Sequence, residues 1–112
     1  MAGFQIVTPV KLGQAAINTS LATLYTVPAS TRTYVKDLDI ANSSNLPINI
    51  TVYLVPSAGT ASNANVLLSF LTVPANGLLQ WAGLQVLNTG DTIQTLANGL
   101  GCTINASGGE AV

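Results

Sequence analysis

Four carboxylates are the only candidates for acid–base catalysis in this chain, because the sequence contains no histidine. They are Asp37, Asp39, Asp91 and Glu110. Asp37 and Asp39 would share one face of a strand, roughly 7 Å apart at a rise of about 3.3 Å per residue. That separation suits the two carboxylates of an inverting glycosidase. Lys36 stands beside them, however, and no pocket signature accompanies them, so we predict a solvated strand face and a protein that is not an enzyme.

Nucleophilic chemistry is also poorly supported. A serine or cysteine nucleophile would need a histidine base, which is missing. Cys102 is the single cysteine, so it can form no disulfide within the chain. It alternates with Ile104 and Ala106, which predicts a small buried side chain on the inner face of a strand rather than a reactive thiol. We therefore predict no catalytic residues.

Cofactor, metal and nucleic-acid sites lack the residues that they need. Gly99-Leu100-Gly101 has no third glycine and is typical of a turn, not of a dinucleotide-binding loop. Asp37, Asp39 or Asp91 with nearby asparagines could supply a weak calcium site, but no known loop spacing is present. Three basic residues against four acidic ones make no basic footprint for nucleic acid. We predict no cofactor, no metal and no nucleic-acid partner.

Sugar binding remains open, because carbohydrate sites combine an aromatic platform with amide and hydroxyl groups. The candidate aromatics are Trp81, Tyr25, Tyr34 and Tyr53. Trp81 lies in the apolar run Leu78-Leu79-Gln80-Trp81-Ala82, which favours a core position over a sugar platform. Tyr53 falls on the outward face of its predicted strand.

The composition combines a large apolar fraction with very few charges. Hydrophobic residues make up 48% of the 112 residues and charged residues only 6%, against about a quarter in an average globular chain. No apolar run reaches the roughly 20 residues of a membrane span, and the N-terminus does not resemble a secretory signal. We expect a protein without a membrane partner that is cytosolic when made or assembles in the cytoplasm. Few ions need desolvating when such surfaces meet, so the composition favours assembly over a monomer.

Period-two alternation runs through most of the sequence and predicts β-structure. In 47–55, Ile48, Ile50, Val52 and Leu54 fall on one face, which indicates a half-buried strand. Turn-forming clusters rich in Pro, Asn, Gly and Ser separate the segments. The predicted strands are 4–10, 21–27, 34–41, 47–55, 66–73, 78–87, 92–97 and 102–107. About eight short strands at this spacing predict an all-β, antiparallel β-sandwich.

Two segments depart from this pattern and one block repeats. Residues 1–20 read as an N-terminal strand followed by a looser connection, or as an arm that orders on a neighbour, ahead of a sandwich domain at 21–112. The tail 107–112 resembles a flexible terminus. Thr-Val-Pro-Ala occurs at 26–29 and again at 72–75. This repeat predicts two similar hairpin-like units, each covering an apolar face of the other.

The blocks 24–29, 35–42, 51–57 and 87–93 resemble a diffuse group of small tailed-bacteriophage proteins. The resemblance covers roughly residues 21–107 and leaves the first twenty residues outside. It implies a β-sandwich that works in many copies on a virion, as a head decoration, fibre or tail module. It carries no catalytic residues.

Three functions follow as hypotheses. The first is a capsid decoration or cement protein with a jelly-roll-like sandwich, which binds the major capsid protein on the virion and forms a trimer or dimer. In it, residues 1–20 lie on the capsid as an arm, and the sheet surface around Tyr53 and the turn tips form contacts between subunits. The second is a tail, baseplate or fibre component that contacts host-surface glycans. A free small lectin or an enzyme is the third.

Overall fold

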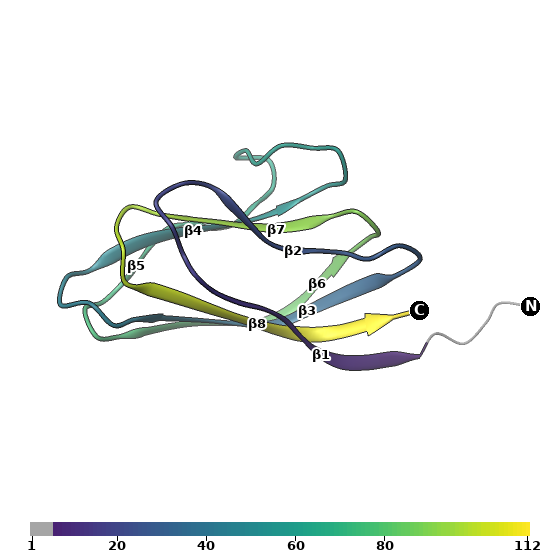
Figure 1. Ribbon diagram of the computed structural model, residues 1–112, viewed down its shortest axis with the longest axis horizontal. Helices are drawn as coiled ribbons and strands as arrows, with labels where there is room; N and C mark the ends of the chain where they lie inside the picture. The colour runs from purple at the N-terminus through teal and green to yellow at the C-terminus, as the bar shows by residue number, and fades with distance from the viewer. Residues whose placement is uncertain (1–5) are drawn as a thin grey trace, which may run out of the picture.

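The computed structural model describes residues 6–112, which form eight strands in two four-stranded antiparallel sheets (Figure 1). One sheet has the order β1-β8-β3-β6 and the other the order β2-β7-β4-β5. The strands are β1 (Val7–Ala16), β2 (Ala22–Thr26), β3 (Arg32–Asn42), β4 (Ile48–Val55), β5 (Val66–Val73), β6 (Leu78–Leu87), β7 (Thr92–Ala97) and β8 (Cys102–Ala111). This strand order makes the domain a jelly roll, which confirms the predicted fold class. No helix in the described part of the chain is long and apolar enough to cross a membrane.

The core fills the space between the two sheets and follows the predicted alternation. In β3, Leu38 and Ile40 are fully buried, and in β4, Ile48, Ile50 and Val52 are buried as well. Cys102, Ile104 and Ala106 line the inner face of β8, so the prediction of a buried Cys102 is confirmed. Trp81 packs partly buried against this core, in agreement with the prediction of a core tryptophan.

The segments 11–16 and 107–111 are more regular than the sequence suggested. The looser connection expected after residue 10 is instead the second half of β1, and Leu12 and Ile17 belong to the core. The expected flexible tail is wrong: β8 continues to Ala111, between β1 and β3 (Figure 1). Gly108 explains why a glycine-rich segment forms a strand here. A Cβ on Gly108 would lie 1.8 Å from the Tyr34 carbonyl oxygen, so only glycine allows β8 and β3 to approach this closely.

The repeated Thr-Val-Pro-Ala block forms similar turns but not hairpins. Val27 and Val73 are both buried, and Ser30 and Asn76 both take a positive φ in the turns that follow. The strands on either side of each turn, however, belong to different sheets, so each block crosses the sandwich. The prediction of hairpin-like units is wrong, because the two strands that flank each turn do not pair with each other. β2 pairs with β7 and β5 with β4 in one sheet, whereas β3 and β6 pair in the other.

A polar link joins the two sheets near the end of β8. The Tyr25 hydroxyl donates to Glu110 Oε2 at 2.5 Å and also lies 2.7 Å from Thr33 Oγ1. Burial, and next the hydrogen bond to Glu110, raise the pKa of Tyr25 from 10.0 to about 12. The fold therefore favours the protonated phenol.

This link predicts a difference in alkaline stability between the natural protein and Tyr25→Phe. As the pH rises from 10 to about 12, Tyr25 ionises in the unfolded chain while the folded chain keeps its proton. The folded state then binds more protons than the unfolded state, so stability falls over this range. Phenylalanine cannot ionise, so the stability advantage of the natural protein over Tyr25→Phe should shrink across the same range. Urea unfolding at a series of pH values measures it, and parallel stability curves would contradict the link.

Candidate interaction surface

The carboxylates that suggested chemistry do not form a catalytic centre in the described residues. Asp91 holds two loops, since Oδ1 accepts from the Ser57 amide at 2.9 Å and Oδ2 from the Asn88 amide at 2.8 Å. Glu110 points between the sheets to Tyr25. Among residues 6–112, no three His, Cys, Asp or Glu side chains gather to hold a metal ion. Burial raises the pKa of the Cys102 thiol, which disfavours the reactive thiolate.

Most of the charged residues instead lie on one surface, the solvent side of the β1-β8-β3-β6 sheet. The term "outer face" is used below for this surface alone. The pairing register places Lys11, Ser107 and Asp37 in one row across β1, β8 and β3, and Asn105 and Asp39 in the next. Lys36 lies at the bulge beside these rows, and Arg32 projects opposite the buried Thr33. Five of the chain's seven charged residues therefore share this face.

An apolar row of the outer face lies between Arg32 and the other four charged residues. Pro9, Gly109, Tyr34 and Val86 form one row across all four strands. Val86 is 49% exposed, and Leu84 on the same edge strand is 55% exposed. Exposed apolar side chains that gather beside polar ones are typical of protein interaction sites.

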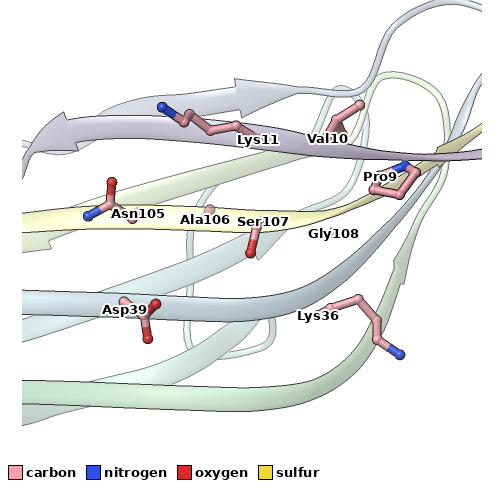
Figure 2. Close-up of a pocket in the computed structure, with 9 residues that line it drawn as sticks. All are labelled: Pro9, Val10, Lys11, Lys36, Asp39, Asn105, Ala106, Ser107 and Gly108. Carbon is pink, nitrogen blue, oxygen red and sulfur yellow. The ribbon is translucent and has the colours of Figure 1, made fainter.

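Backbone bulges hollow this face. The register shifts between Lys11 and Gly13 in β1, and between Val35 and Asp37 where β3 meets both of its neighbours. Bulges bend a sheet and redirect side chains. A depression of about 500 Å³ lies here, lined by Pro9, Val10, Lys11, Lys36, Asp39, Asn105, Ala106, Ser107 and Gly108 (Figure 2). A second, of about 350 Å³, shares Pro9, Lys36 and Gly108 and extends to Leu84.

Each of the two aspartates on the outer face has one carboxylate oxygen that receives no hydrogen bond from the described residues. Asp37 Oδ1 and Asp39 Oδ1 are both shielded from solvent, and neither has a hydrogen-bond partner in the described residues. Burial raises the pKa of Asp39, and the adjacent Asp37 carboxylate raises it further. Both residues are half-buried, and a shielded carboxylate oxygen without a donor is unfavourable in the free protein. A donor or a cation supplied by another molecule would relieve this cost.

The sugar-platform candidates are dispersed. Tyr25 is turned between the sheets and Trp81 packs on the core. Tyr34 lies on the outer face and Tyr53 on the opposite sheet, in β4. The structure instead brings out Phe70, which sequence reasoning missed. Phe70 is 60% exposed on β5, at a hollow lined by amide and hydroxyl side chains.

The apolar residues of β6 were also missed as surface residues. Leu84 and Val86 resemble core residues in the sequence, because they continue an apolar run. β6 is the edge strand of its sheet, and the bulge opposite Lys36 turns this part of the strand outward. No signal in the sequence alone predicts that register.

No protein-family model matches the sequence, and no curated protein matches it. The fold is similar to that of solved viral chains. VP2 in the subviral particle of infectious bursal disease virus superposes with a TM-score of 0.52 at 12% identity, over 96% of this chain. A chain in the structure of the Gx strain of the same virus gives 0.51 at 16% identity, also over 96% of this chain. The protein spans about a third of those chains, 32% and 31% respectively. These neighbours share the jelly-roll fold, and they come from infectious bursal disease virus rather than from a tailed bacteriophage.

Proposed function

We propose that the protein is a non-enzymatic structural component of a virion, which docks on the particle through its outer face. The observation that carries this proposal is that five of the seven charges lie on both sides of an exposed apolar row, on the outer face of one sheet. The fold supports it, because similar jelly rolls occur in particle-forming viral chains. The resemblance to small tailed-bacteriophage proteins points the same way.

The charges and the shielded carboxylate oxygens of the outer face suit a protein as the binding partner. Its charges have both signs, with Lys11, Arg32 and Lys36 against Asp37 and Asp39. Mixed charges give orientation and specificity rather than general attraction to a polyanion. A partner that donates hydrogen bonds to the shielded oxygens of Asp37 and Asp39 would remove their desolvation cost.

Our leading specific proposal is a capsid decoration or cement protein of a bacteriophage, with the major capsid protein as partner. Binding only to the assembled shell would stabilise it by mass action. Many weak contacts on one particle would add through multivalency. A trimer or dimer would increase this effect. The predicted arm 1–20 contributes through β1, which carries Val7 and Pro9 on the outer face, while its residues 1–5 lie outside the described residues.

A tail, baseplate or fibre component is the second candidate. Phe70 and its polar hollow favour it, because they lie on the sheet opposite the outer face, where host glycans would be reached. Copy number on purified virions separates the two: copies spread over the whole shell support decoration, and copies confined to the tail support the second candidate.

Leu84→Lys should weaken attachment to the particle by at least about tenfold, as expected when a charge is placed in an apolar contact. The new ammonium group would stand beside Lys36 and would have to lose its water on docking. Leu100→Lys is the matched control, because Leu100 is 72% exposed but lies in the β7–β8 loop, away from the outer face. Co-sedimentation with particles grown without the protein measures both variants. Equal retention of Leu84→Lys and the natural protein would refute docking through this face.

A further inference from the structure

We propose that the hollow beside Phe70, on the outward side of the β2-β7-β4-β5 sheet, is a binding site for one ring of a neutral saccharide. This deepens the second candidate function, contact with glycans, and does not depend on attachment through the outer face. The hollow measures about 230 Å³, which suits a ligand smaller than a drug-sized molecule. It is lined by Thr19, Asn49, Thr51, Phe70, Leu96, Ala97 and Asn98.

The hollow spans three strands of the sheet, β5, β4 and β7. Phe70 comes from the edge strand β5, and Thr51 lies beside it on β4. Leu96 pairs with Thr51 from β7, so the two side chains form the floor. Thr19 closes the far side from the β1–β2 loop, which is fixed to β7 by the hydrogen bond from the Ala97 amide to the Asn18 carbonyl at 2.9 Å. Rigid strands thus hold most of the lining.

A β-bulge in β5 places Phe70 at the edge of the hollow. Ile50 pairs with Leu71 and Val52 with Leu68, so two residues of β5, Ser69 and Phe70, stand opposite Thr51. Phe70 takes a φ of 50°, in the left-handed region that a bulky residue avoids. Its amide donates to Thr51 Oγ1 at 3.2 Å, which fixes the bulge. An exposed aromatic residue kept in a strained conformation is a mark of a functional position.

The polar side chains around the ring are positioned to donate. Asn49 Oδ1 accepts from the Thr72 hydroxyl at 2.9 Å, and Asn98 Oδ1 accepts from the Asn49 amide at 2.9 Å. Each of these oxygens accepts one hydrogen bond and keeps a second lone pair, and the side-chain NH₂ groups supply the donors for a ligand. The hydroxyls of Thr19 and Thr51 add groups that can both donate and accept.

These features select the class of ligand. None of the lining residues is charged, so nothing compensates a phosphate, a carboxylate or an ammonium group. A purely apolar ligand would leave the two amide groups covered and unpaired. A pyranose ring has an apolar face of C–H groups for Phe70 and a rim of hydroxyls for the amides. A neutral sugar satisfies both halves of the site.

The site can be tested on the free protein by NMR titration with glucose, galactose and N-acetylglucosamine. We expect millimolar binding of at least one of them, seen as shifts of the side-chain NH₂ signals of Asn49 and Asn98 and of the Phe70 amide. Phe70→Gly should abolish these shifts. Because glycine adopts a positive φ without strain, the urea midpoint of this variant should equal or exceed that of the natural protein.

Two further variants complete the test. Phe70→Trp keeps an aromatic platform and should retain binding, and Leu84→Lys on the opposite sheet should bind sugar like the natural protein. No shift at the hollow with any of the three sugars would overturn the proposal. Equal shifts in Phe70→Gly would overturn it too, because the ring would then play no part. Particle attachment is measured separately, so its failure would not be confused with failure here.

Discussion

Gly108→Ala is expected to lower the free energy of unfolding by more than about 4 kcal/mol, in the range of exceptional single substitutions. The added Cβ would meet the Tyr34 carbonyl oxygen at 1.8 Å, a backbone atom that no rotamer change can move. β8 would have to separate from β3 beside the bulge at Lys36. Because β8 also pairs with β1, the distortion would reach the whole sheet. Urea unfolding followed by circular dichroism measures the change.

Gly99→Ala is the matched control for that substitution. A Cβ on Gly99 would meet nothing closer than Ile48 Cγ1 at 3.7 Å, an ordinary van der Waals contact. Where the backbone accepts alanine, the change from glycine stabilises by about 0.4–1 kcal/mol through the unfolded chain. We expect Gly99→Ala to leave stability unchanged or slightly higher. A Gly108→Ala protein as stable as Gly99→Ala would show that β8 does not continue past Ser107.

Asn42→Ala is expected to cost about 3 kcal/mol, because about 1–3 kcal/mol is lost for each buried group left without a partner. The Asn42 side chain is 2% exposed. Its Nδ2 donates to the carbonyls of Leu46 at 2.7 Å and Val73 at 3.1 Å. Its Oδ1 accepts from the Ser44 amide at 2.9 Å. One side chain thus joins the end of β3 to its loop and to β5.

Asn45→Ala, in the same loop, provides the comparison for Asn42→Ala. Asn45 is exposed, so its replacement should change stability by no more than about 0.5 kcal/mol. The two variants differ only in which asparagine is lost. Equal urea midpoints for the two variants would mean that the Asn42 hydrogen bonds contribute little to stability. That result would contradict the expected loss of about 3 kcal/mol.

The strands could be predicted wherever one face is buried and the other is polar. The alternation of Leu38 and Ile40 with Asp37 and Asp39 identified β3, and Cys102, Ile104 and Ala106 identified β8. The same rule failed at the chain ends. Gly108 and Gly109 carry no side chains to alternate, so their strand depends on the neighbours β1 and β3 rather than on their own pattern.

The surface sites could not be predicted, because they depend on register. Whether Leu84 faces the core or the solvent is set by the bulge opposite Lys36. Phe70 likewise reaches the surface through the bulge opposite Thr51. Bulges arise from the fit between strands that are distant in sequence. The composition alone showed that charged residues are few. That most of them lie on one sheet could be seen only from the strand order and register.

Cryo-electron microscopy of the intact virion would show which surface of the protein is buried on the particle. We expect the outer face of the jelly roll to be buried against a neighbouring subunit, with Leu84 and Asp39 inside that contact. The sheet that carries Phe70 should face the solvent. A particle in which the β1-β8-β3-β6 sheet is exposed and the protein is held by another surface would refute docking through the outer face.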